Sequence, residues 1–187
     1  MPRVIPNGPT GYTGYTGYTG ATPVGEFFLA TDLGWPSTTA GCNAIASLEL
    51  NSLMTVKHFA FDAAGDEYAE WTVVMPSDWD AGTVTAVFYW LHPATDTNFD
   101  VVWAAQGTSY GNDDALNGTW ENPQTVTDTG GTTSDLYISG ATSAITISNA
   151  AASELVQFRI YRDGDDESDN LAVDAFLLGV MITYTRS

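Results

Sequence analysis

The sequence predicts an all-β fold, an antiparallel jelly-roll sandwich that follows a short collagen-like Gly-X-Y stem. Apolar and polar residues alternate in many short segments, which turn residues separate. No segment has the period of an amphipathic helix, and glycine recurs at every third position near the N-terminus. An immunoglobulin-like sandwich is the alternative. It usually closes on fewer residues, and its Cys-Trp-Cys pattern is absent from a chain with one cysteine.

Residues 8–22 form the predicted stem. Its glycines open five successive triplets, at Gly8, Gly11, Gly14, Gly17 and Gly20. Only glycine fits where three chains meet at the axis of a triple helix, so the repeat predicts a homotrimer. A flexible Gly/Thr linker is the alternative, because five triplets are few and the third positions hold Thr instead of hydroxyproline.

Residues 1–7 precede the stem and are predicted to anchor it in another protein, with a disordered tip as the alternative. This segment lacks the apolar stretch of a signal peptide, and no apolar run in the chain is long enough to span a membrane. These features predict a protein that is made in a bacterial cytoplasm and does not insert into membranes.

The charge of the chain limits its partners. It has 23 acidic and 5 basic residues, a formal net charge of -18. Nucleic acids are excluded as partners, because their binding needs Lys and Arg to neutralise phosphates. Anionic membrane surfaces would also repel such a chain. The single Cys42 forms no intrachain disulfide, so stability must come from the core and from assembly.

Residues 24–187 are predicted to form one head domain, since about 160 residues suit a single core. The strand with the strongest signal covers residues 83–91, which are almost all β-branched or aromatic. The polar segment 106–131 is expected to leave the body of the domain. The other expected strands cover residues 44–50, 57–61, 70–75, 100–105, 124–127, 136–138, 144–148, 155–162 and 171–184.

The last expected strand is apolar on both faces. Val173, Ala175, Leu177 and Met181 alternate with a second set, which consists of Phe176, Leu178, Val180 and Ile182. A sandwich strand places one face in its own core. We expect the second set to form the trimer interface of the head. Coverage by loops of the same chain is the alternative.

The residue types needed for catalysis are scarce. Besides carboxylates, only His58, His92 and Cys42 have pKa values that a site could tune. The chain has no Gly-x-Ser-x-Gly elbow, phosphate loop or His-x-x-x-His pair. The sequence therefore predicts that the protein is not an enzyme and needs no cofactor.

The segment 163–170 concentrates carboxylates between the last two expected strands. Four of them could bind Ca²⁺ through hard oxygen ligands, namely Asp163, Asp165, Asp166 and Asp169. The spacing does not match an EF-hand, so a solvated hairpin loop is favoured. Arg162 alternates onto an apolar face and needs a partner, for which we expect Asp174.

The tryptophans divide into two groups. Trp71, Trp90 and Trp103 lie in expected strands and are predicted to fill the core. Trp120, Trp79 and Trp35 lie in loop-like segments near Asn and Asp, where an aromatic ring could stack on a sugar. Trp120 and Trp79 are the predicted glycan contacts, with ordinary packing as the alternative.

The stem motif at residues 11–17, Gly-Tyr-Thr-Gly-Tyr-Thr-Gly, followed by an all-β head resembles two groups. These are the C1q and tumour-necrosis-factor-like trimers and the trimeric fibres, spikes and decoration proteins of tailed bacteriophages. Residues 158–163 and 177–180 look like the end of a jelly-roll head in such phage proteins. Because a secretion signal is absent, the phage group is the better match.

The resemblance implies a structural protein on the virion surface, a short trimeric head fibre or capsid decoration. Residues 1–7 would attach it to other virion proteins. The alternative is a receptor-binding module, such as a tail fibre or spike tip, that recognises host surface polysaccharide. A polysaccharide-acting enzyme is a third and less favoured reading.

Overall fold

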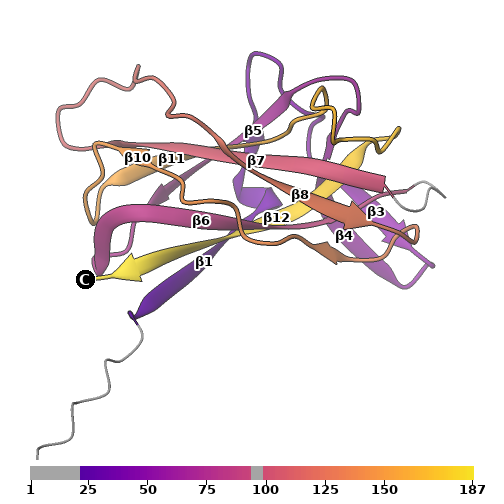
Figure 1. Ribbon diagram of the computed structural model, residues 1–187, viewed down its shortest axis with the longest axis horizontal. Coiled ribbons are helices and arrows are strands. Elements are labelled where there is room, and N and C mark those ends of the chain that lie inside the picture. The colour runs from indigo at the N-terminus through magenta and orange to yellow at the C-terminus, as the bar shows by residue number, and fades with distance from the viewer. Residues whose placement is uncertain (1–21, 94–98) are drawn as a thin grey trace, which may run out of the picture.

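In the computed structural model, residues 22–93 and 99–187 are described, and they form a sandwich of two β-sheets (Figure 1). The predicted anchor and the predicted stem, apart from Thr22, lie outside the described residues. Within the described ranges the one helix is η1 (Thr31–Leu33), which is far too short to cross a bilayer.

Each sheet contains six strands. Sheet I consists of β1 (Val24–Ala30), β3 (Ala46–Leu50), β4 (Met54–Phe61), β6 (Trp79–Leu91), β9 (Tyr137–Ile138) and β12 (Ala175–Arg186). Sheet II consists of β2 (Trp35–Pro36), β5 (Glu67–Val74), β7 (Phe99–Tyr110), β8 (Gln124–Gly130), β10 (Ile147–Ser148) and β11 (Leu155–Arg162).

The strand order confirms the predicted fold class. In sheet I the order β4-β12-β6-β9 faces β5-β11-β7-β8 in sheet II. The chain changes sheet at each step from β4 through β5 and β6 to β7, and it changes sheet again between β11 and β12. This alternation between the two sheets is typical of a jelly roll. All paired strands are antiparallel except the short β10, which pairs with β7 in parallel. The sequence did not predict β1, which pairs with β12 along an edge that it shares with β4.

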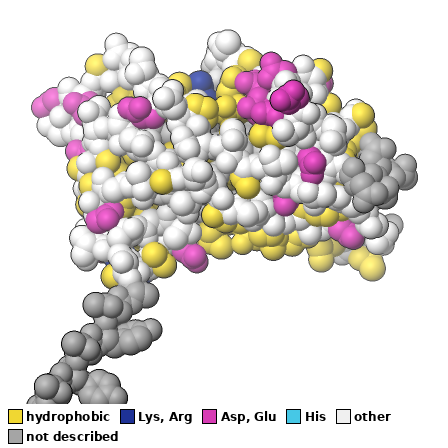
Figure 2. Space-filling model, in the orientation of Figure 1, with side chains coloured by type: hydrophobic (Ala, Val, Ile, Leu, Met, Phe, Trp, Pro, Cys, Tyr) yellow, Lys and Arg dark blue, Asp and Glu magenta, His cyan; other side chains and the backbone are white. Residues whose placement is uncertain are grey.

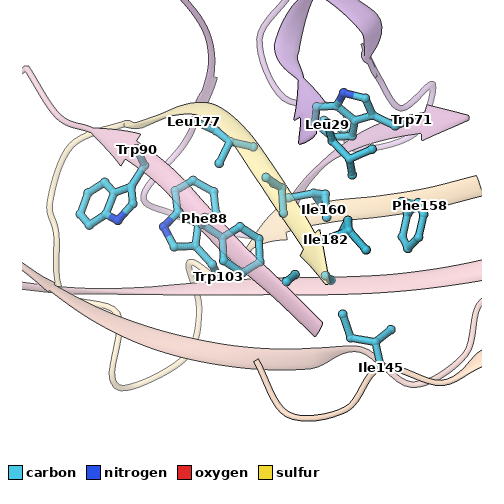
Figure 3. Close-up of a cluster of buried hydrophobic side chains, with 14 of the residues drawn as sticks. Leu29, Trp71, Phe88, Trp90, Trp103, Ile145, Phe158, Ile160, Leu177 and Ile182 are labelled. Atoms are coloured by element: carbon cyan, nitrogen blue, oxygen red, sulfur yellow. The ribbon is translucent and has the colours of Figure 1, made fainter. Parts of the chain in front are cut away.

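Aromatic side chains from both sheets fill the space between them (Figure 3). Trp103 of sheet II stacks on Phe88 of sheet I, with ring centroids 5.6 Å apart. Trp71, Trp90 and Trp103 are all fully buried, as predicted. Trp79 contradicts its prediction: it begins β6 and is only 2% exposed, so its ring is not available to a glycan.

A bulge in β12 corrects the predicted face of this strand. Leu177 pairs with Trp90 and Gly179 with the adjacent Tyr89, so one extra residue stands in β12. An extra residue reverses the alternation of side chains beyond it. Of the four residues of the predicted trimer interface, Phe176 and Leu178 therefore lie outside the core. The other two, Val180 and Ile182, are fully buried in the core, so the prediction was wrong for them.

Gly179 is required at this bulge for steric reasons. Its φ is +157°, and a Cβ there would collide with the ring of Phe28 on β1. Met181, which alternation had placed with the core residues, instead lies opposite Phe28 in the β1–β12 pairing. The apolar outer surface of β12 is thus made by Phe176, Leu178 and Met181.

A buried ion pair fastens the acidic segment 163–170 to the sandwich. The guanidinium of Arg162 is fully buried and donates to both carboxylate oxygens of Asp169, at 2.8 and 2.6 Å. It also donates to the carbonyls of Leu171 and Val173. Asp169 in turn accepts the Val102 amide at 3.0 Å. The prediction that Asp174 pairs with Arg162 was therefore wrong, since the partner is Asp169.

We expect Asp169→Ala to lower the free energy of unfolding by about 3–5 kcal/mol, because it leaves a buried guanidinium without its counterion. Asp174→Ala, the matched control, should cost less than about 1 kcal/mol. Urea denaturation followed by circular dichroism measures both. Equal losses for the two variants would contradict the assigned pairing.

Candidate functional site

The outer face of sheet II carries a row of polar and aromatic side chains across four strands. Directly opposite one another lie Trp35 on β2, Glu70 on β5, Arg159 on β11 and Gln106 on β7. Opposed residues of an antiparallel ladder point to the same side of the sheet. The sequence neighbours of Glu70 and Arg159 fill the core, namely Ala69, Trp71, Phe158 and Ile160. The row that contains Glu70 and Arg159 therefore faces outward.

A charge pair stands at the centre of the row. Nη2 of Arg159 lies 2.8 Å from Oε1 of Glu70, and Nε of Arg159 donates to the same oxygen at 3.2 Å. Nε2 of Gln157 donates to the second carboxylate oxygen at 2.9 Å. The two bonds from Nε and Nη2 restrain the plane of the guanidinium.

Trp120 packs against this fixed guanidinium. The Arg159 guanidinium carbon lies 4.3 Å from the centre of the Trp120 ring and 5.0 Å from that of Tyr68. Both distances are within the range of cation–π attraction. Trp120 belongs to the segment between β7 and β8, so the long polar excursion folds back over sheet II. Its ring is half-buried there and keeps part of its surface exposed.

A polar groove of about 260 Å³ lies between this segment and the strands β7 and β10. Two hydroxyls inside it, of Thr108 and Ser148, are 3.1 Å apart. The other polar side chains of the lining are those of Tyr110, Asp114, Thr119, Glu121 and Asn149. None of the described residues that line the groove is basic, so its chemistry suits a neutral, hydroxyl-rich ligand better than an anion.

The size of the groove also limits its ligand. Sites for drug-sized molecules span roughly 300–1,000 Å³. A groove of about 260 Å³ suits one small polar unit of a longer molecule. Trp120 and the groove lie in the same part of sheet II, because both Thr119 and Glu121, the neighbours of Trp120, line the groove.

Acidic side chains gather in one cluster on the sheet II side of the molecule (Figure 2). Carboxylate oxygens of Asp66, Asp163 and Asp165 lie within 4.8 Å of one another. This set differs from the predicted calcium ligands, because Asp169 is bound to Arg162 and Asp166 accepts the Ser168 amide at 2.7 Å.

Asp66 joins the acidic cluster from the loop between β4 and β5, which the sequence did not indicate. Burial and, next in size, the nearby carboxylate of Asp66 together raise the pKa of the Asp163 carboxyl to about 6. Burial also raises the pKa of Asp66. Such clusters are common without an ion, so calcium binding stays a prediction.

The three tunable groups found in the sequence lie away from the groove. Cys42 is buried, and burial raises the pKa of its thiol to about 12. His58 is buried and stacks on Phe176 at 4.1 Å, and burial lowers its pKa. His92 is also buried. None of the three lines the polar groove.

Sequence alternation carried a signal for part of this site. Arg159 lies between Phe158 and Ile160, which are core residues, so its outward direction follows from the pattern. The partners of Arg159 could not be found in that way, because Glu70 and Trp120 are distant in sequence. That Trp120 contacts a glycan stays a prediction, although the ring does lie on an outer surface.

No known protein family matches the sequence, and no curated protein is similar to it. Several solved structures are similar in fold, and many of them are carbohydrate-binding modules. A xylan-binding module of family 15 shares 16% identity over 89% of this chain and 99% of its own, with a TM-score of 0.46. A family 22 xylan-binding domain from Paenibacillus barcinonensis shares 11% identity over 85% and 99%, with a TM-score of 0.47.

A third similar structure is a family 28 module specific for non-crystalline cellulose. It shares 14% identity over 83% of this chain and 87% of its own, with a TM-score of 0.45. Identities and TM-scores at this level describe a broad similarity of fold. We therefore derive the function from the side chains of this chain.

The acidic cluster makes stability depend on pH. Since the pKa of Asp163 is raised to about 6, the folded state favours the protonated carboxyl. The protonated carboxyl of Asp163 contributes fully to stability when the pH is below the usual pKa of an Asp. This contribution is lost as the pH rises through about 6. We expect Asp163→Asn to raise the melting temperature at a pH of about 7.5 and to change it little at a pH of about 4.

Thermal denaturation across this pH range measures the effect. Asp135→Asn, which changes an exposed carboxylate elsewhere, is the matched control and should show no such difference. Parallel pH profiles for Asp163→Asn and the unmodified protein would rule out the assigned cause.

Proposed function

We propose that this protein is a non-catalytic head domain that binds neutral polysaccharide on the outer face of sheet II. The observation that carries the proposal is the position of Trp120, which packs on the Arg159 guanidinium and stands in sequence between two residues of the polar groove, Thr119 and Glu121. We call this region the Trp120 surface and define it by Trp35, Tyr68, Trp120, Arg159 and the groove.

The Trp120 surface combines the two contacts that a sugar chain needs. An aromatic ring offers a flat apolar face to the C–H groups of a pyranose, and hydroxyl, amide and carboxylate groups pair with its hydroxyls. The Arg159–Glu70 pair holds the ring in place before binding. A side chain that is already ordered loses less entropy when the ligand arrives.

Charge selects among polysaccharides. The chain has a formal net charge of -18, and the groove itself includes Asp114 and Glu121. A uronic acid or sulfated polymer would be repelled by this field. We therefore propose a neutral polysaccharide as the ligand class.

The absence of enzymatic activity is part of the proposal. The polar groove borders no histidine or cysteine among its described lining residues. Burial keeps the thiol of Cys42 protonated at neutral pH, since its pKa is raised to about 12. Glycoside hydrolases use two carboxyl groups, and of the two in the groove Asp114 already accepts the backbone amide of Gly111 at 2.8 Å. Our proposal is therefore binding without turnover.

The glycine repeat favours a second, structural role that is compatible with the first. We propose that residues 8–22 hold three copies together and that residues 1–7 attach them to a virion of a tailed bacteriophage, as a head fibre or capsid decoration. Five uninterrupted Gly-X-Y triplets support this role. Antibodies against the head should label purified phage particles, and unlabelled particles would contradict it.

We expect Trp120→Ala to raise the Kd for polysaccharide by at least about tenfold. A tenfold change corresponds to about 1.4 kcal/mol, and truncating an anchoring tryptophan usually costs more than that. Affinity electrophoresis in gels that contain xylan, β-1,3-1,4-glucan or galactan identifies the ligand, and calorimetry then measures Kd. Anionic alginate should not retard the protein.

Leu116→Ala is the matched control, because Leu116 is exposed in the same segment and does not line the groove. It should bind like the unmodified protein, and the circular dichroism spectra of both variants should show that the β-sandwich stays folded. Failure of the unmodified protein to bind any of the neutral polymers would refute the proposal, as would full binding by Trp120→Ala.

A further inference from the structure

The outer face of sheet I is apolar over a wide area. Successive rows of its ladder place Phe28 beside Met181 and Val87, and Gly179 between Ala30 and Tyr89. Ile138 continues the second row on β9. The solvent face of an antiparallel sheet normally carries polar residues. Figure 2 shows the consequence, a band of hydrophobic side chains along the sheet I side of the molecule.

An apolar groove of about 430 Å³ lies in this face. Its lining includes Phe28 of β1 and Leu136 of the segment before β9, which are 46% and 56% exposed. The other apolar side chains of the lining are Ala30, Val56, Tyr89 and Leu178. The charged residues of the lining are Asp32 and Lys57, whose charges offset each other. We call this region the Phe28 face.

We propose that the Phe28 face is buried against two further copies of this chain, which meet around the axis of the stem. The proposal rests on the trimeric stem proposed above and is independent of polysaccharide binding. β1 begins at Val24, two residues after the predicted stem ends, and it supplies Phe28 to the face. The first strand after the predicted stem therefore carries part of the apolar surface.

The glycine repeat determines how many copies meet. A strict Gly-X-Y period requires three chains, and joining three heads at their first strand raises their effective concentration to the millimolar range for short connections. Five triplets are few for a triple helix that stands alone. Contact between the heads would supply the stability that the stem lacks.

Charge identifies the face through which copies could touch. Each copy has a formal net charge of -18, so heads repel one another wherever carboxylates face each other. The outer face of sheet II bears the Glu70 row, and the loops that lead into β5 and out of β11 bear the acidic cluster. The Phe28 face instead offers almost balanced charge and exposed apolar groups. A second copy therefore fits the Phe28 face.

A threefold ring also needs two different patches on each copy, because its contacts are heterologous. The groove supplies a hollow. The tip of the β3–β4 hairpin supplies projecting apolar side chains, Leu53 and Met54, which are 91% and 61% exposed. We infer that the hairpin tip of one copy packs into the groove of the next.

Sedimentation equilibrium of the full chain tests this inference. We expect a trimer for the unmodified protein, and we expect Phe28→Asp and Leu53→Asp each to raise the concentration at which it dissociates by about tenfold or more. Leu53 is almost fully exposed, so its substitution should leave the fold of the head intact. Leu116→Asp, an equally drastic change on an exposed residue of the other side, should leave the trimer unchanged.

The outcomes separate this inference from the proposals on which it rests. A trimer that both variants leave unchanged would overturn the Phe28 face as the contact and retain the stem. A monomer at all concentrations of the unmodified protein would overturn both. Retained binding of neutral polysaccharide by the Phe28→Asp variant would support the independence of the two faces.

Discussion

Strand β12 is apolar on both faces, and a strand in a two-layer sandwich can place only one of them in its own core. The rest of the structure follows from how this conflict is resolved. The bulge at Leu178 sends Val180 and Ile182 into the core with Leu177 and leaves Met181 outside. β1 then pairs along β12 and adds Phe28 to the same outer surface. The sandwich is thereby complete within one chain but still has an apolar outer face.

The two outer faces differ in chemistry, and the difference suits them to different partners. Sheet I presents apolar side chains, among them Phe28 of β1, the first strand after the predicted stem. Sheet II presents hydroxyls, carboxylates and the Arg159–Trp120 stack. An assembly that buries the first face would leave the second exposed on the outside of each copy. Three binding surfaces on one stem would gain avidity for a repetitive polymer without any new contact.

The sequence predicted the jelly roll, most strands and the buried positions of Trp71, Trp90 and Trp103, because alternation and turn residues report directly on local structure. The prediction from sequence was wrong where one extra residue changes the register of β12. The alternation of apolar and polar residues does not reveal the bulge before Gly179, although a glycine within a strand is itself a signal of a bulge. The prediction from sequence also assigned the wrong partner to Arg162, because the true partner, Asp169, is brought to it by the path of the loop between β11 and β12. The Arg159–Glu70–Trp120 cluster joins three distant segments, so only the fold reveals it.

Hydrogen–deuterium exchange of the full chain, with and without soluble xylan and β-1,3-1,4-glucan, tests the central claim most directly. Exchange reports protection of backbone amides segment by segment. The account predicts slower exchange in residues 111–123, which contain Trp120, when one of these neutral polymers is present. It predicts no change in residues 50–54 at the hairpin tip of sheet I. Unchanged exchange in 111–123 with both polymers, or protection at the hairpin tip instead, would contradict it.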